Sequence, residues 1–212
     1  MAQEARPDLL LEAWKLVAEK GWRGFSPIEL ARRTGRPLPE IYAVFTEPRD
    51  LLRALGHRLD AAMLDVPLAE LERLSVRERL FELLMRRFEA MRPFRDGLAA
   101  AGREVWCDPA LLCGTIANLE RGSYWLLEAS EAGLSGIWAR LGRCALQIAY
   151  VRVFRVFLED DTADLSRTMA ELDKRLGELE SLARFAGFAR PARPAPEAPA
   201  GGTEGGEAPA SA

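Results

Sequence analysis

Residues 9–45 hold three short helical segments separated by two glycine turns, and this arrangement constrains the fold more than any other feature of the chain. Apolar side chains recur every three or four residues from Leu9 to Val17, which predicts the first helix. Gly21 and Gly35 follow the first and second segments, where glycine readily takes the left-handed backbone of a helix end. A short helix, a tight turn and another short helix predict a helix-turn-helix.

The second of these segments carries its own start signal. Ser26 is placed to cap the helix, Pro27 suits its first position, and Glu29 follows three residues after the serine, as in a capping box. Its expected buried residues are Ile28, Leu30 and Ala31.

Composition describes an ordinary globular protein of 212 residues, with 49% apolar and 29% charged residues. The net charge of −3 makes the whole chain a poor non-specific ligand of nucleic acids, so any DNA binding must come from a local basic face. The first residues lack the apolar core of a signal peptide, and no apolar run reaches the length of about 20 residues that a membrane span needs. We therefore expect a cytoplasmic protein.

The chain lacks the usual starting points for catalysis, cofactor binding or metal binding. His57 is the only histidine, and Cys107, Cys113 and Cys144 have no metal-ligand spacing, so we expect these cysteines to be core thiols. The acidic run at 159–161 fits a solvated loop better than a metal cluster. With no phosphate-binding loop and no paired nucleophile and base, we expect a protein that is not an enzyme and has no cofactor.

Helical periodicity continues to about residue 188 without a strand pattern, which predicts an all-α fold of about nine helices. The segment 134–158 is the most apolar and is expected to be a central buried helix. The remaining tail is rich in Pro, Ala and Gly and cannot bury enough surface to order. The predicted units are a head at 1–64, a helical body at 65–188 and a disordered tail at 189–212.

The last helix carries leucines spaced by three and four residues. Such a seam suits another helix, from the same chain or from a second copy. We expect it to form part of a homodimer interface together with the helix at 134–158. The expected interface residues on the last helix are Leu172, Leu176 and Leu179.

One set of N-terminal positions resembles the DNA-binding domain of the TetR family of bacterial regulators. The matching residues are Leu9-Leu10, Ala13, Gly21, Ser26, Leu30-Ala31, Gly35, Ile41-Tyr42, Phe45 and Leu51-Leu52. The resemblance implies a TetR-like fold, with a three-helix head and a larger body for ligand binding and dimerisation. It further implies a one-component regulator, typically a repressor, that binds operator DNA as a dimer and responds to a hydrophobic small molecule.

The third helix departs from that family's habit. Pro37, Leu38, Pro39 and Glu40 stand where small polar and basic residues are usual, so DNA contacts would depend on neighbouring arginines. A solvated helix face remains an equally good interpretation of those arginines. The candidate DNA-binding residues are Arg32, Arg33, Arg36, Leu38, Glu40, Tyr42 and Arg49.

Large apolar residues of the body could line a ligand pocket between helices, as is usual in bodies of this fold. The alternative is a packed core, because such residues at helical spacing are most often buried against one another. The candidate pocket residues are Met85, Phe88, Trp106, Tyr124, Trp125, Trp138 and Phe154.

The body also resembles a second group. The segments 57–64, 76–98 and 163–182 are similar to the lipid-binding accessory proteins of ubiquinone biosynthesis in the Coq group, which have a TetR-like fold. That resemblance implies an alternative function, the binding of a lipid or isoprenoid without DNA binding. The apolar third helix favours this alternative, whereas the arginines around it permit the regulator.

Overall fold

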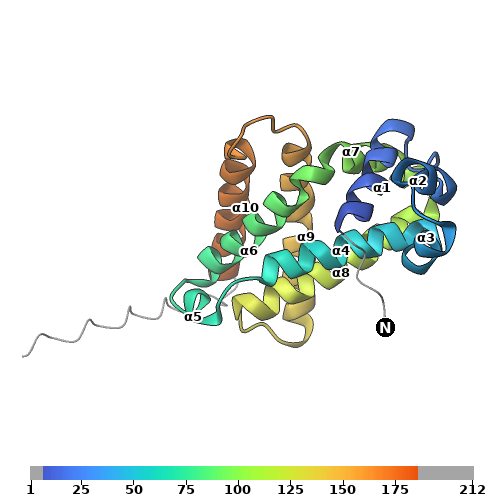
Figure 1. The fold of residues 1–212 in the computed structure, drawn as a ribbon. Helices are drawn as coiled ribbons and strands as arrows, with labels where there is room; N and C mark the ends of the chain where they lie inside the picture. Colours follow the sequence, from blue (N-terminus) through green and yellow to red (C-terminus); the bar gives the residue numbers. More distant parts are fainter. Residues whose placement is uncertain (1–6, 186–212) are drawn as a thin grey trace, which may run out of the picture.

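The computed structural model describes residues 7–185, and all regular structure in that range is helical (Figure 1). This confirms the all-α prediction, with nine helices of seven or more residues and one short helical turn, α5, in the described range. The predicted disorder of 189–212 lies outside the described residues. The α-helices are α1 (Pro7–Lys20), α2 (Pro27–Thr34), α3 (Leu38–Val44), α4 (Pro48–Leu64), α5 (Leu68–Leu71), α6 (Val76–Met91), α7 (Arg95–Glu104), α8 (Pro109–Ser130), α9 (Gly136–Leu158) and α10 (Ser166–Phe185), and the 3-10 turns are η1 (Arg92–Phe94) and η2 (Val105–Cys107).

Helices α1 to α3 pack into a small head (Figure 1). Gly21 and Gly35 have φ angles of 78° and 67°, the left-handed backbone that the sequence predicts at both turns. Leu30 and Ile41 are fully buried between the helices, and the rings of Phe25 and Phe45 pack edge to face. The shared apolar core therefore fixes α2 and α3 as a helix-turn-helix pair.

The start of α2 differs from the prediction. Ser26 makes no side-chain cap, and Glu29 forms an ion pair with Lys20 of α1 instead of closing a capping box. Ile28 is 53% exposed rather than buried, because it lies on nearly the opposite side of α2 from Leu30, which is fully buried. Pro27 at the first helical position is enough to begin this helix without a side-chain cap.

Helix α4 connects the head to the body, where it packs against α6 and α8 (Figure 1). Its first turn is held by Asp50, which is 4% exposed and accepts hydrogen bonds from the backbone and hydroxyl of Thr46 at 2.9 and 2.8 Å. Asp50 also accepts from the Glu47 backbone, in a capping box with that residue. The chain direction after α3 is thereby set by one buried carboxylate.

The head also packs directly on the body through α1 and α7. Gly97 makes this possible, since a Cβ at that position would lie 2.6 Å from the Trp14 carbonyl oxygen. At the far end of α7, Glu104 accepts hydrogen bonds from the backbone N–H groups of Trp22 and Arg23 at 2.9 and 3.3 Å. The turn between α1 and α2 is therefore bonded to the end of a body helix.

Two expectations about the last helices need correction. Helix α9 is not a central buried helix: it buries Val153 and Phe157 but leaves Ile137 60% exposed and Ile148 59% exposed. The reason is that its neighbours α7, α8 and α10 cover only one side of it. On α10, Leu172 and Leu176 are buried within the chain at 1% and 3% exposure, so the leucine seam is filled by this chain rather than left open for a partner.

The acidic loop after α9 is also not uniformly solvated. Asp160 is fully buried, and its two carboxylate oxygens accept hydrogen bonds from the backbone and hydroxyl groups of Thr162 and Thr168. Burial alone would raise the pKa of Asp160, but these four hydrogen bonds lower it to about 2. The ionised carboxylate therefore anchors the first turn of α10.

Replacing Asp160 with Asn should destabilise the protein by about 2 kcal/mol at pH 7, the free energy that corresponds to lowering the carboxyl pKa from 3.8 to about 2. Because the folded-state pKa lies below the ordinary value of 3.8, this stability is complete above about pH 5 and is lost as pH falls toward 2. Urea unfolding between pH 7 and pH 3 should show that the difference in the free energy of unfolding between wild type and variant becomes smaller as the pH falls. Asp161→Asn, at an 88% exposed side chain, is the matched control and should change little.

Candidate functional site

The outer surface of α3 is the natural place for a nucleic-acid contact in a helix-turn-helix. Ile41 and Phe45 fasten this helix to the head, while Leu38 and Tyr42 point outward at 52% and 66% exposure. The exposed side therefore offers one phenol hydroxyl and an apolar side chain, but no cation.

Two of the arginines predicted to bind DNA are held by carboxylates of the head. Arg33 donates from Nε to Glu12 at 3.0 Å and from Nη1 to Glu19 at 2.8 Å, both on α1. Arg36 pairs with Asp8 of α1 and with Glu40 of α3. These ion pairs neutralise the basic face in the isolated chain, and Glu40 contributes to that neutralisation.

The other two predicted arginines differ in their surroundings. Arg49 is exposed and pairs with Glu47 at the start of α4. Arg32 is exposed and makes no hydrogen bond or ion pair with any described residue. Among the four predicted arginines, only Arg32 is therefore available without breaking an ion pair in the described part of the chain.

Helices α4, α6 and α8 meet in the body (Figure 1). Side chains of these three helices form a buried ionic network. Asp60 of α4 is 6% exposed and pairs with two guanidinium groups, Arg87 of α6 and Arg121 of α8. Its bond to the Arg121 Nε is 2.6 Å long. Arg121 also donates to Asn118, whose amide donates to the Leu52 carbonyl of α4 at 2.8 Å. Two cations share one carboxylate, so the network binds the connecting helix to the body and retains one positive charge.

This network was not identified from the sequence. In the structure Arg87 is 5% exposed, and its guanidinium carbon lies 5.9 Å from the centre of the Tyr150 ring. Burial would lower the pKa of Arg87, but Tyr150 and Asp60 outweigh that effect and raise it, so the side chain stays charged. Helical periodicity cannot distinguish a paired buried arginine from an exposed one.

The predicted ligand-pocket residues separate into two groups. Met85 and Phe88 are buried, and Phe88 stacks on Tyr150, 5.4 Å between ring centres, beside Phe154 and Phe157. This aromatic cluster, Phe88, Tyr150, Phe154 and Phe157, adjoins Arg87. The remaining four are exposed, Trp106 at 79% and Tyr124, Trp125 and Trp138 at 45–46%. They do not line one enclosed pocket with the first group.

Cys107, Cys113 and Cys144 are also exposed, so the expectation of core thiols is wrong. Each lies on the outer side of a 3-10 turn or helix rather than between helices. Among residues 7–185, no cluster of three or more His, Cys, Asp or Glu side chains is placed to hold a metal ion. Nor does any helix within this described range combine the length and the apolar composition needed to cross a bilayer.

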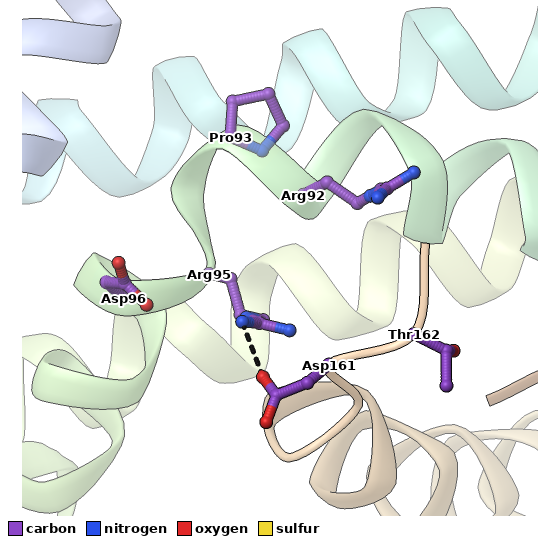
Figure 2. Close-up of a pocket in the computed structure, with 6 residues that line it drawn as sticks. All are labelled: Arg92, Pro93, Arg95, Asp96, Asp161 and Thr162. Atoms are coloured by element: carbon purple, nitrogen blue, oxygen red, sulfur yellow. Dashed lines mark hydrogen bonds and ion pairs between the residues drawn. The ribbon is translucent and has the colours of Figure 1, made fainter. Parts of the chain in front are cut away.

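A small polar hollow opens between η1, the start of α7 and the loop before α10, as Figure 2 shows. Its volume is about 250 Å³, and its lining includes Arg92, Pro93 and Asp96. Arg95 crosses it, donating to Asp161 at 2.9 Å and to the backbone carbonyl of Asp160. A polar hollow closed by its own ion pair does not match the apolar pocket that the sequence predicts.

Comparison with known proteins identifies the fold. No protein-family model and no curated protein sequence matches the chain. The chain is similar to the crystal structure of a TetR transcriptional regulator from Nitrosomonas europaea ATCC 19718, with a TM-score of 0.67 and 22% identity over 81% of this chain and 96% of that one. It is also similar to a transcriptional regulator from Rhodococcus sp. Rha1, with a TM-score of 0.60 and 18% identity over 84% and 97% of the two chains. The chain therefore has the fold of TetR transcriptional regulators.

Replacing Asp60 with Asn should destabilise the protein by about 3–5 kcal/mol, because Arg87 would remain buried without a charged partner. Urea unfolding of the wild type and the variant measures this difference. Glu82→Gln is the matched control: it breaks the exposed pair between Glu82 and Arg86 on the same helix as Arg87 and should cost less than about 1 kcal/mol. Equal losses in the two variants would contradict a dominant role for the buried network.

Proposed function

We propose that this chain is a TetR-type transcriptional regulator, a repressor that binds operator DNA as a homodimer and responds to a hydrophobic small molecule. The observation that supports this most is the complete helix-turn-helix of the head, whose last helix α3 presents Leu38 and Tyr42 outward. The fold shared with two proteins described as transcriptional regulators adds support. In this role the protein is a binding protein rather than an enzyme.

Binding to DNA would depend mainly on the arginines beside α3, because α3 itself carries no cation. Arg32 is free to approach a phosphate in the isolated head. Arg33 and Arg36 would have to exchange carboxylate partners for phosphate, which the high charge density of DNA favours at low salt. Tyr42 would add a hydroxyl donor to the backbone or a base edge. Weak and strongly salt-dependent binding is therefore expected.

An effector would act through α4, the helix that carries the head. The aromatic cluster and the Asp60 network lie next to each other, joined at Arg87 and Tyr150. A ligand with an aromatic or isoprenoid group that entered beside the cluster would disturb the charged partners of α4. Movement of α4 would then change the spacing of the two heads on DNA, whose half-sites lie about one helical turn apart.

A second candidate function is supported by the same head. Arg33 and Arg36 are already neutralised by four carboxylates, and Ile28, Leu38 and Tyr42 leave an apolar surface where a DNA-binding protein usually has donors. These observations favour a lipid- or isoprenoid-binding accessory protein, as in ubiquinone biosynthesis, that has a TetR-like fold and no DNA binding.

Titration of the protein onto DNA from its own upstream region, at several salt concentrations, distinguishes these candidates. Arg32→Ala should weaken binding and reduce the slope of log K against log salt by about 0.9, one phosphate contact. The triple variant Arg32→Ala, Arg33→Ala, Arg36→Ala should lose up to three such contacts if the ion pairs open on DNA. Arg73→Ala, at an exposed arginine of the body, is the control and should leave the slope unchanged.

Two results would contradict the DNA-binding proposal. If the triple variant keeps the affinity and salt slope of the wild type, the arginines do not contact DNA. If the wild type ignores DNA altogether while it binds isoprenoid quinones saturably, the accessory-protein function replaces the regulator.

Effector binding should raise the stability of the folded chain. A ligand at about 100 times its dissociation constant adds about 2.7 kcal/mol when it binds only the folded state. A thermal-shift screen of quinones, isoprenoids, fatty acids and aromatic compounds measures this. Phe154→Ala, within the aromatic cluster, should reduce the shift, whereas Phe185→Ala, at a 93% exposed ring, should not. No shift with any compound would argue that the cluster is only a packed core.

A further inference from the structure

The polar hollow beside η1 is lined by two arginines that have only one carboxylate close to them. Arg92 of η1 is exposed, and its side chain makes no hydrogen bond or ion pair with any residue between positions 7 and 185. Arg95, three residues further on, faces Asp161 across the hollow (Figure 2). Asp96 also lines the hollow, but Figure 2 shows it on the far side of Arg95 from Arg92. The side of the hollow that Arg92 and Arg95 share therefore has an excess of positive charge.

The carboxylate of Asp161 is a weak occupant of this space. Its side chain is 88% exposed, and its oxygen lies 2.9 Å from the Arg95 Nη2. Ion pairs this open to water contribute little to stability, so an incoming anion can displace Asp161 at small cost. Arg95 also donates from Nη1 to the backbone carbonyl of Asp160, and that bond would keep the guanidinium in place during the exchange.

The other polar groups of the loop before α10 already have partners. The Asp160 carboxylate accepts hydrogen bonds from Thr162 and Thr168, and the Thr162 hydroxyl also accepts one from the Ser166 backbone N–H at 3.0 Å. These bonds hold the loop in one conformation and leave its groups no need of a ligand. Once Asp161 turns to solvent, the binding capacity beside Arg92 consists of guanidinium N–H groups, which are donors only.

Donors without acceptors select an oxyanion. The planar fork of a guanidinium matches the oxygens of a phosphate, and a dianion carries more charge than the single carboxylate that it replaces. The hollow, with a volume of about 250 Å³, is larger than the about 30 Å³ of one water and smaller than the about 300–1,000 Å³ of pockets for drug-sized molecules. It therefore suits a small phosphate rather than an extended organic ligand.

We propose that this hollow is a binding site for a small phosphate dianion, which is held between Arg92 and Arg95 after Asp161 turns away. The site goes beyond the proposed function, because it takes part neither in DNA contact nor in the binding of a hydrophobic effector. The bound ion would join η1 and the start of α7 to the loop between α9 and α10. Since α1 of the head packs on α7, the ion would also fix the body helix on which the head rests.

Calorimetric titration of the full chain with inorganic phosphate at pH 8, with the ionic strength held constant by chloride, measures the dissociation constant. Arg92→Gln removes one charged donor and should weaken binding at least about tenfold. Because the Arg92 side chain is exposed and has no partner in the described part of the chain, the variant should fold normally, as circular dichroism would verify. Arg103→Gln, at an exposed arginine in the last turn of α7, is the matched control and should leave the constant unchanged.

A gain of affinity tests the exchange with Asp161. Asp161→Asn removes the competing carboxylate and should tighten phosphate binding about fivefold, the upper value for an exposed ion pair. Phosphate should also raise the melting temperature saturably, and lower concentrations should suffice in Asp161→Asn. An arginine pair that only stabilises the fold would show neither effect.

Three results would overturn the proposal. These are no saturable binding of phosphate, binding that Arg92→Gln leaves unchanged, or binding that Asp161→Asn does not strengthen. Binding to phosphatidic acid vesicles that depends on Arg92, in a chain that ignores inorganic phosphate, would also overturn it and would assign the arginines to lipid headgroups. None of these titrations contains DNA, so they can fail without affecting the DNA-binding proposal.

Discussion

The arrangement of α4, α6 and α8 depends on the ion pairs of a single buried carboxylate, that of Asp60. It is bonded to guanidinium groups from α6 and α8, and it belongs to α4, the connection between head and body. Taking Asp60 and Arg87 out of water is costly, and that cost is offset only while the two stay paired. We therefore expect the network to favour one register of α4 against α6 and α8, because a slide of α4 would leave Arg87 buried without its carboxylate. Gly56 of α4 leaves room for the network, since a Cβ there would lie 2.3 Å from an Arg121 Nη atom and 2.5 Å from the Asn118 amide oxygen.

Local patterns predicted the parts of the fold that depend on local chemistry. The glycine turns at Gly21 and Gly35 are present as expected, because each involves atoms only a few residues apart. A capping box formed by Ser75 and Glu78 at the start of α6 is equally local. The capping box predicted at Ser26 is absent because of a contact between two helices. Glu29, the residue expected to close it, pairs instead with Lys20 of α1, and the local pattern of α2 does not predict that contact.

The candidate sites were harder to predict, since they depend on which helices become neighbours. Periodicity identified Arg33 and Arg36 as a basic face, but most of the acidic residues that neutralise them come from α1. It could not identify Arg87 as a buried residue, because a paired, buried arginine and an exposed one have the same spacing. For α9 the apolar content was predicted correctly, but the burial was not: its neighbours cover only one side of it, so several of its apolar side chains lie at the surface.

Gly97 and Glu104 attach the head closely to α7. With the α1 backbone seated against a glycine and the next turn bonded to the same helix, α7 and the head have no soft joint between them. Movement of the head and α7 against the rest of the body would then involve α4, which packs on α6 and α8, and the η1 turn with Pro93 between α6 and α7. The head and α7 would therefore move as one unit. A side chain larger than hydrogen at position 97 would push α1 away from α7 and so change the orientation of the whole head. The position of the outer surface of α3 would change with it.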